Sequence, residues 1–272
     1  MSRAERAVSL GLWTLVGLTV LAVAAGRAQE IQEPQEPTDT LAAVQQEMVE
    51  AVGGAAAWEA VSAVELRGVR NRNGYEMGLA AWLARPHRVR VEHTLRGQVE
   101  TFVYDGERGW LERLSDAGTF SPLEPQETRQ RLDEVEKYLR WPEVWRRYAE
   151  ARLDGVEERA GRTVHRLLLV ADGGGPAETW LVDRASGRVV EIVEPTVGED
   201  GEQFEVRSFA WDHRDVDGIL VPHYVEIDQG TSLYSYEVRS VVVDPPLPEG
   251  LFEPAPGPDA GAGDDSGGDP PE

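Results

Sequence analysis

Residues 88–106 read RVRVEHTLRGQVETFVYDG, and apolar and polar side chains alternate in this stretch on both sides of Gly97. A period of two is typical of β-strands, because successive side chains point to opposite faces of a sheet. Gly97 turns the chain once, and Asp105-Gly106 is a dipeptide typical of tight hairpin turns. The stretch therefore predicts antiparallel strands at 87–95 and 98–104.

The same alternation and the same turn residues recur on both sides of this stretch. Further strands are expected at 63–71, 75–84, 108–114, 156–160, 162–171, 177–183, 188–194, 203–211, 219–227 and 233–243. Strands joined by tight turns run antiparallel, and so many in one sheet twist strongly enough to curl toward a barrel. The predicted fold is α+β: an incomplete, strongly curled antiparallel β-barrel of about 11–12 strands. Helices are expected to cover its concave apolar face.

Helical periodicity marks the beginning and the middle of this region. A helix is expected over 39–52, where apolar residues recur at helical spacing until Gly53-Gly54 ends the pattern, and a short helical turn follows at 55–61. A central helix is expected after Pro125, which is a favourable residue for a first helical turn. Pro142 should break or kink that helix. An aromatic face is expected to continue through Trp141, Trp145 and Tyr148.

Residues 1–28 have the composition of a secretory signal peptide. A positively charged start precedes an apolar run at 8–25, and small residues offer cleavage after Ala24 or after Ala28. The alternative is an uncleaved membrane anchor, because the apolar run approaches the ~18 residues at which a spanning helix becomes possible. The chain contains no cysteine. It therefore lacks the residue that is acylated in lipoproteins, and the expected location is periplasmic.

The rest of the chain divides into three parts by composition. Residues 29–37 are polar and interrupted by proline, which is typical of a linker. Residues 38–254 carry the strand and helix patterns and form the predicted domain. Residues 255–272 contain only Ala, Gly, Pro, Asp, Ser and Glu, a composition that cannot bury apolar area and predicts a disordered acidic tail.

The charge of the chain limits its partners. The net charge is −22, and residues 1–28 contribute three arginines and one glutamate, so the exported part carries 24 basic and 48 acidic side chains, a net charge of −24. Such a surface repels phosphate backbones and anionic lipid surfaces. No nucleic-acid partner is therefore expected. The simplest role of the charge is solubility.

The common catalytic motifs are absent from the sequence. There is no Gly-x-Ser-x-Gly elbow, no His-Glu-x-x-His pair and no glycine-rich phosphate loop with lysine. The five histidines are scattered, and no pair of carboxylates is distinguished from the acidic background. The sequence therefore predicts a binding protein without a catalytic residue, a metal or a cofactor.

One acidic stretch, residues 212–218, is compared with a calcium-binding loop. Its glycine, Gly218, takes the sixth position of the loop only if His213 is the first ligand, and the twelfth position is then Tyr224 instead of glutamate. Because both ends of the template fail, a solvated hairpin turn is the preferred interpretation.

Aromatic residues are candidates for a ligand cavity. Seven tryptophans follow the signal segment, and four of them lie in or beside predicted strands. Burial in the core is the simplest role for any one of them, because tryptophan covers a large apolar area. The functional interpretation is that several line an apolar cavity beneath a helical cover. The candidate residues in the cavity or its lid are Trp82, Phe102, Tyr104, Trp110, Trp141, Trp145, Trp180 and Trp211.

Three short motifs, in this order, resemble the LolA/LolB-like superfamily of periplasmic lipoprotein carriers. They are Trp82-x-x-Arg85-Pro86, then Tyr104-Asp105-Gly106 followed by Trp110, and finally Leu251-Phe252-Glu253-Pro254. The resemblance implies an incomplete antiparallel barrel whose concave face is covered by helices. It also implies that the cavity holds acyl chains and uses no cofactor.

In that superfamily the arginine of the first motif helps to hold the lid closed and is needed for transfer of the cargo, and it matches Arg85 here. A guanidinium offers several donors that can satisfy loop carbonyls, which fits that role. The alternative is a surface arginine before a proline that ends a strand.

Two functions remain open from the sequence. The first is a carrier for lipid or lipoprotein acyl chains, with lipid or an acylated protein as partner. The second is an envelope sensor or interaction module that binds a partner protein, such as an envelope membrane protein, with the same concave face. A monomer is expected in both cases.

Overall fold

The computed structural model describes residues 39–139, 148–172, 174–198 and 201–255. All of them fall within one unit that begins at Asp39. The expected signal peptide, the expected linker and most of the expected acidic tail therefore lie outside the described residues, as do Trp141, Pro142 and Trp145.

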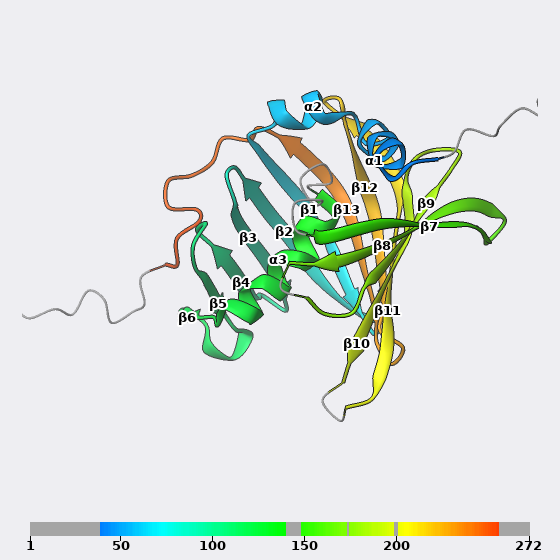
Figure 1. The fold of residues 1–272 in the computed structure, drawn as a ribbon. Helices are drawn as coiled ribbons and strands as arrows, with labels where there is room; N and C mark the ends of the chain where they lie inside the picture. Colours follow the sequence, from blue (N-terminus) through cyan, green and yellow to red (C-terminus); the bar gives the residue numbers. More distant parts are fainter. Residues whose placement is uncertain (1–38, 140–147, 173, 199–200, 256–272) are drawn as a thin grey trace, which may run out of the picture. The chain divides into compact units, whose positions relative to one another are not determined.

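The strands of the described residues form one antiparallel sheet (Figure 1). They are β1 (Ala63–Arg72), β2 (Tyr75–Ala84), β3 (Arg88–Leu95), β4 (Gln98–Tyr104), β5 (Gly109–Glu112), β6 (Ser121–Pro122), β7 (Tyr148–Arg159), β8 (Arg162–Ala171), β9 (Glu178–Asp183), β10 (Val189–Val197), β11 (Gln203–Val216), β12 (Ile219–Asp228) and β13 (Leu233–Val243). The predicted curled antiparallel sheet is confirmed, with thirteen strands instead of 11–12.

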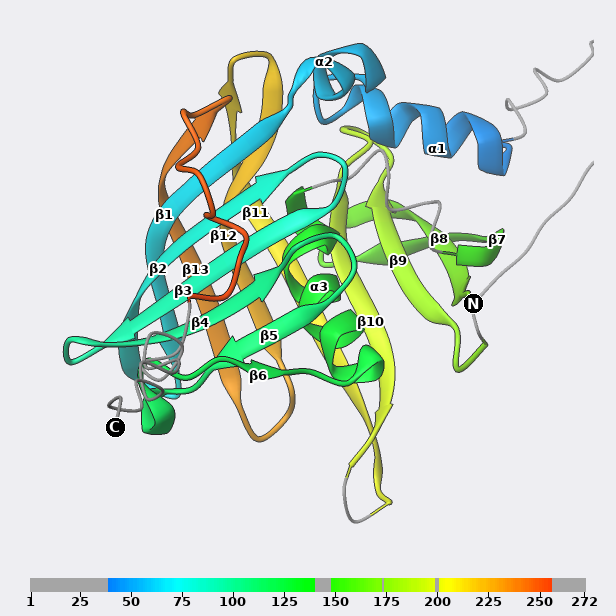
Figure 2. The same ribbon diagram turned by 90° about the vertical axis from the view of Figure 1, so that its left-hand side faces the viewer.

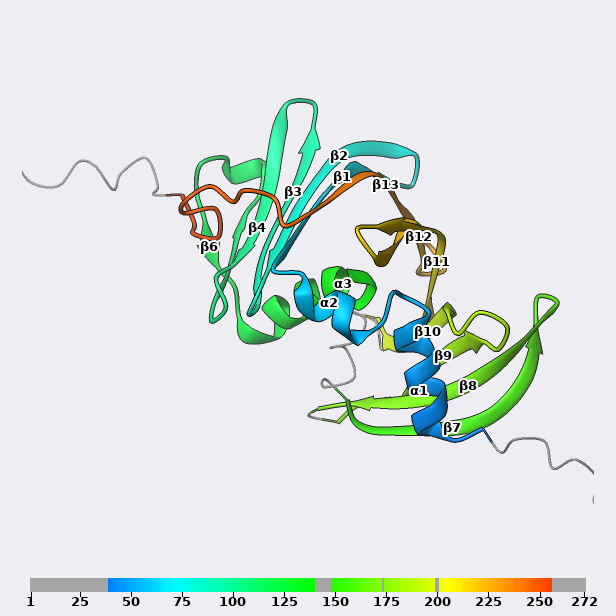
Figure 3. The same cartoon turned by 90° about the horizontal axis from the view of Figure 1, so that it is seen from above.

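The sheet consists of two meanders joined in its middle. Strands β1 to β6 neighbour one another in sequence order, as do β7 to β13, and β1 pairs with β13 from Val64 opposite Val243 to Arg72 opposite Tyr234. The two free edges are therefore β6 and β7. Helix α3 (Pro125–Leu139) follows the first edge and lies inside the curl, as the view from above shows (Figure 3).

A β-bulge at the central junction contributes to the curl. The register of β1 against β13 shifts between Arg67 and Gly68. A Cβ atom built on Gly68 would lie 2.0 Å from the carbonyl oxygen of Glu237, so only glycine permits this close approach of the two backbones. Bulges increase the local twist of a sheet, which helps to bend this one toward a barrel.

Helices α1 (Leu41–Glu50) and α2 (Ala55–Ala60) cover one end of the concave face. The side chain of Thr40 caps α1 by accepting a hydrogen bond from the backbone of Ala43, and the apolar side of α1 buries Val44 and Met48. Trp58 of α2 is buried in the same core, and its indole donates to the carbonyl of Val52. The helices predicted at 39–52 and 55–61 are thus confirmed. No helix among the described residues is long and apolar enough to cross a membrane.

The segment after β13 runs across the convex face of the first meander (Figure 2). Phe252 is buried there against Ala63 and Ala84. The guanidinium of Arg88 lies 4.9 Å from the ring centre of Phe252, and Arg90 donates to the carbonyl of Leu251. The convex face therefore has a small apolar cluster of its own.

Two local predictions were wrong. Strand β6 was not predicted, because two residues are too few to show a period. Tyr148 was expected to continue the aromatic face of the central helix, but it begins β7 and pairs with Ala171. Its ring packs edge-on against Trp180 of β9, 5.7 Å between ring centres, so a tertiary contact holds it in the sheet.

Replacing Gly109 with alanine should push the first turn of α3 away from β5. The added Cβ would lie 2.5 Å from the Oγ1 atom of Thr128, which is buried. We expect Gly109→Ala to lower the free energy of unfolding by about 1–3 kcal/mol in urea denaturation. Thr128→Ala removes the clashing atoms, so the double variant should recover part of the loss. Losses that simply add would show that the two residues do not touch.

Candidate functional site

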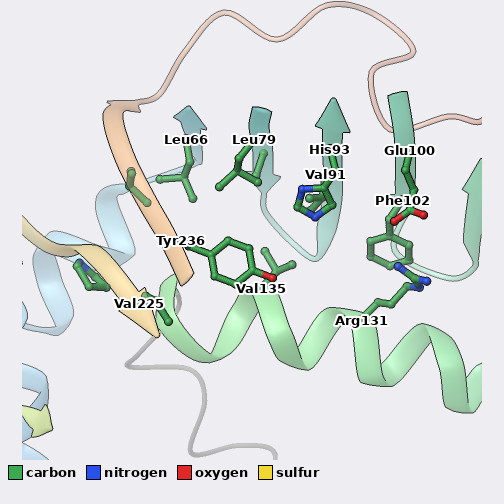
Figure 4. A pocket seen from close by; sticks show the side chains of 13 residues that line it. Leu66, Leu79, Val91, His93, Glu100, Phe102, Arg131, Val135, Val225 and Tyr236 are labelled. Carbon is green, nitrogen blue, oxygen red and sulfur yellow. The ribbon is translucent and has the colours of Figure 1, made fainter. Parts of the chain in front are cut away.

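A cavity lies between α3 and the concave face of the sheet (Figure 4). Its volume is about 90 Å³. One water-sized group needs only about 10–15 Å³, so the cavity has room for several. The residues that line it are Leu66, Leu79, Ala81, Val91, His93, Glu100, Phe102, Arg131, Val135, Pro222, Val225, Tyr236 and Val238.

Strand register explains why the floor of the cavity is apolar. Leu66 of β1 lies opposite Ala81 of β2, Ala81 lies opposite Val91 of β3, and Val91 lies opposite Phe102 of β4. Directly opposed residues share a face of the sheet. These four side chains therefore form one apolar row across four strands, which we call the apolar row.

The next row on the same face becomes polar. Leu79 of β2 lies opposite His93 of β3, and His93 lies opposite Glu100 of β4. On the other side of the cavity, Tyr236 of β13 lies opposite Arg70 of β1. The cavity thus changes from apolar to polar along the direction of the strands.

Helix α3 supplies the cover. Its residues Leu132 and Val135 pack against the core, and Arg131 and Val135 line the cavity. Figure 4 shows the side chain of Arg131 reaching from α3 toward Phe102 and Glu100. Its Nε atom lies 3.7 Å from the Glu127 carboxylate and has no hydrogen-bond partner. The predicted helical cover of a concave apolar face is therefore present over this cavity.

His93 is kept neutral by its surroundings. Burial lowers the pKa of His93 to about 3, and the positive charges of Arg70 and Arg131 add to that effect. Its Nδ1 atom is buried and has no hydrogen-bond partner in the part of the chain that the structure describes. The histidine therefore brings polar atoms to the cavity without bringing charge.

Three of the aromatic candidates lie on the concave side. Phe102 lines the cavity. Tyr104 packs against the core, and its hydroxyl donates to the carbonyl of Gly106. Trp180 is fully buried away from the cavity, where its indole donates to Glu178.

The other described tryptophans are not brought to the cavity. Trp82 packs on the convex cluster around Phe252, and the guanidinium of Arg67 lies 5.3 Å from its ring centre. Trp110 neighbours Leu111, which belongs to the core, and alternation places Trp110 on the opposite face. Trp211 is 43% exposed and stacks on Tyr224, with 5.0 Å between ring centres.

Arg85 lies at the end of α2 instead of in the cavity. Its Nε donates to the carbonyl of Val61 at 2.8 Å, and its terminal nitrogen donates to the carbonyl of Trp58 at 2.9 Å. Val61 is the C-cap of α2, and the Trp58 carbonyl also accepts a hydrogen bond from the backbone N–H of Val61, so Arg85 adds donors at the end of this helix. Arg85 therefore fastens α2, and with it Trp58, to the rim of the sheet.

Sequence reasoning missed four polar residues of the cavity: His93, Glu100, Arg131 and Tyr236. The position of His93 could have been predicted, because His93 lies on the same face of its strand as Val89 and Val91, which are buried. Arg131 and Tyr236 come from α3 and β13, and nothing local in the sequence brings those elements together.

Another buried carboxylate, Glu191, belongs to a structural cluster outside this cavity. Burial alone would raise the pKa of Glu191, but hydrogen bonds from Arg159 and Arg207 outweigh it and lower that pKa. Among the described residues, no three His, Asp or Glu side chains are grouped to hold a metal ion. Residues 212–218, the stretch compared with a calcium-binding loop, form the end of β11 and the turn after it. Within β11, Arg214 forms an ion pair with Asp212.

The chain matches no known family model and no curated protein sequence. Its fold is nevertheless shared by solved structures. A DUF1329 family protein from Desulfovibrio piger matches with a TM-score of 0.56 and 13% identity, over 79% of this chain and 98% of that one. An outer-membrane lipoprotein-sorting domain from Vibrio parahaemolyticus matches with a TM-score of 0.52 and 10% identity, over 77% and 94%.

A LolA superfamily protein from Nitrosomonas europaea matches with a TM-score of 0.50 and 11% identity, over 79% of this chain and 97% of that one. At these identities the matches establish the fold alone. The chain has a LolA-like fold, which confirms the fold expected from the three motifs.

Substitution of His93 should change how stability depends on pH. The unfolded histidine has a pKa of about 6.5 and the folded one about 3, so unfolding takes up a proton between these values. Stability from this group is thus present above pH 6.5 and is lost as the pH falls. In the unaltered protein His93 should make the free energy of unfolding fall by about 1.4 kcal/mol for each pH unit from about pH 6 down to about pH 4. We expect His93→Gln to remove this contribution to the slope.

The measurement is urea denaturation across this pH range, and His87→Gln, at an exposed position between β2 and β3, is the control. An unchanged slope in His93→Gln would mean that His93 is not held neutral in the folded protein.

Proposed function

We propose that this protein is a periplasmic carrier that holds the acyl chain of a lipid or lipoprotein in the cavity beneath α3. The single observation that carries the proposal is the apolar row, Leu66, Ala81, Val91 and Phe102, which belongs to the core and also lines the cavity. Each methylene group buried there would contribute about 0.8 kcal/mol. The site binds and releases its ligand without chemistry.

The described volume suits part of an acyl chain, so loading requires α3 to move outward. Leu132 and Val135 of this helix are partly buried where they pack on the core, and Thr128 is buried at its first turn. These are the described contacts that outward movement of α3 would break.

Export supports the same function. Residues 1–28 have the composition of a signal peptide, and the periplasm is a compartment in which acylated cargo needs an apolar shelter from water. The LolA-like fold agrees with this role, and the acyl chain, not a cofactor, is the proposed occupant.

Enlarging a residue of the apolar row should block the cavity. Ala81 is 3% exposed and lines it, whereas the neighbouring Ala80 points to the opposite face. We expect Ala81→Leu to weaken binding of a dansyl-labelled fatty acid by about tenfold or more in a fluorescence titration. Ala80→Leu makes the same chemical change outside the cavity and should bind as the unaltered protein does.

Equal binding by both variants would place the ligand elsewhere. Copurification of a membrane protein, with no fatty acid bound by any variant, would favour the interaction module over the carrier.

Loss of the Arg85 side chain should speed ligand release more than it lowers stability. Arg85→Leu removes the side-chain donors to the carbonyls of Trp58 and Val61, which costs about 1–3 kcal/mol, while the Trp58 carbonyl keeps the backbone N–H of Val61 as a donor. We propose that α2 then loosens at the rim of the barrel. Stopped-flow displacement of the labelled fatty acid should show faster release, and Arg67→Leu, at an exposed arginine of the convex face, is the control. Release at the original rate would remove Arg85 from the proposed site.

A further inference from the structure

Two residues that line the cavity and one that contacts its lining each have a buried polar atom without a hydrogen-bond partner among the described residues. These atoms are the Nε of Arg70, the Nδ1 of His93 and the Nε of Arg131. Buried polar side-chain atoms in folded proteins are usually satisfied, so each exception requires an explanation. A cluster of three around one cavity points to a ligand that supplies the missing partners.

The cluster is assembled from β1, β3 and α3. Arg70 lies opposite Tyr236, and its guanidinium is 5.6 Å from the ring centre of that tyrosine, which lines the cavity. His93 and Arg131 line the cavity directly. Both arginines are close enough to His93 to lower its pKa. His93 and Arg131 therefore border the cavity, and Arg70 lies next to it through its contact with Tyr236.

The charge at this end is opposite to that of the whole chain. The net charge of the protein is −22, yet Arg131 lines this end. Arg70 lies over the rings of Tyr234 and Tyr236, and Arg72 lies over the ring of Tyr234. In the described part of the chain, Arg70 and Arg72 have no ion pair. Arg131 has a long one of 3.7 Å to Glu127. Glu100 is the acidic residue that lines the cavity, and it offsets one cation only.

We propose that the ligand of this cavity is a single-chain amphiphile with an anionic head, such as a fatty-acid carboxylate. This inference rests on the proposed function. The tail lies along the apolar row, and the head lies among Arg70, His93 and Arg131. A neutral histidine donates one hydrogen bond to the head. The guanidinium groups supply charge-assisted hydrogen bonds, which are the strongest available for a carboxylate.

The test compares ligands that share the same twelve-carbon tail and differ in their head group. Isothermal titration at low ionic strength and above neutral pH measures the binding of dodecanoate, dodecyl phosphate, dodecanol and dodecyltrimethylammonium to the full chain. We expect both anions to bind about tenfold more tightly than dodecanol, and dodecyltrimethylammonium to bind most weakly. The preference should shrink as salt is added. Acetate, which has the head without the tail, should not compete.

Two substitutions should shift the preference in opposite directions. Arg131→Gln should weaken binding of both anions while that of dodecanol stays the same, and Glu100→Gln should strengthen binding of the anions. Arg129→Gln, an exposed position on the same helix, is the matched control and should change nothing. A fold defect cannot produce opposite shifts, so the pair separates electrostatics from damage.

The outcomes separate the two proposals. If dodecanol binds as tightly as dodecanoate, or if Arg131→Gln weakens the binding of all ligands equally, the proposal of an anionic head is wrong. The proposal that the cavity binds an acyl chain would still stand. If none of the four amphiphiles binds, the proposed carrier function itself fails. Tighter binding of dodecyl phosphate than of dodecanoate would support the anionic head and assign it as a phosphate.

Discussion

Antiparallel pairing of β1 with β13 joins the first strand of the sheet to the last. Each meander can form from local hairpins, but neither can enclose a concave space alone. The pairing places strand β1 beside β13, which itself pairs with β12. Leu66 of β1, Val225 of β12 and Val238 of β13 therefore line one cavity. The pairing also tolerates no side chain at Gly68, where the backbone of β13 approaches most closely. The cavity and its charged end therefore depend on the pairing of β1 with β13.

The sheet stops short of a closed barrel, and the two edges are treated differently. Edge strands risk pairing with other chains. Strand β6 has only two residues, and β7 is interrupted by register shifts and carries several charged side chains. After the β6 edge the chain continues as α3, which lies on the concave side of the sheet. The cover therefore lies over the cavity and not over the convex face.

Much of the fold followed from local sequence, because alternation and turn residues act within a few positions of one another. The strand at 88–95 and its hairpin partner at 98–104 are examples, and the helix at 41–50 is another. Residue type alone was a poor guide to the site. Tryptophan can lie on either face of a sheet. The alternation along β2 places Trp82 on the convex face and Ala81 on the concave face, where it lines the cavity. Arg131 and Tyr236 come to line one cavity only through the pairing of β1 with β13, so no local pattern in the sequence predicts their place in the site.

The segment after β13 and the cavity lie on opposite sides of the sheet. Phe252 is anchored on the convex face, whereas the cavity lies on the concave face. The backbone therefore leaves the sheet on the side away from the cavity. Attachment through this end, whether to a solid support or to another domain, would orient the molecule with the cavity and α3 on its free side.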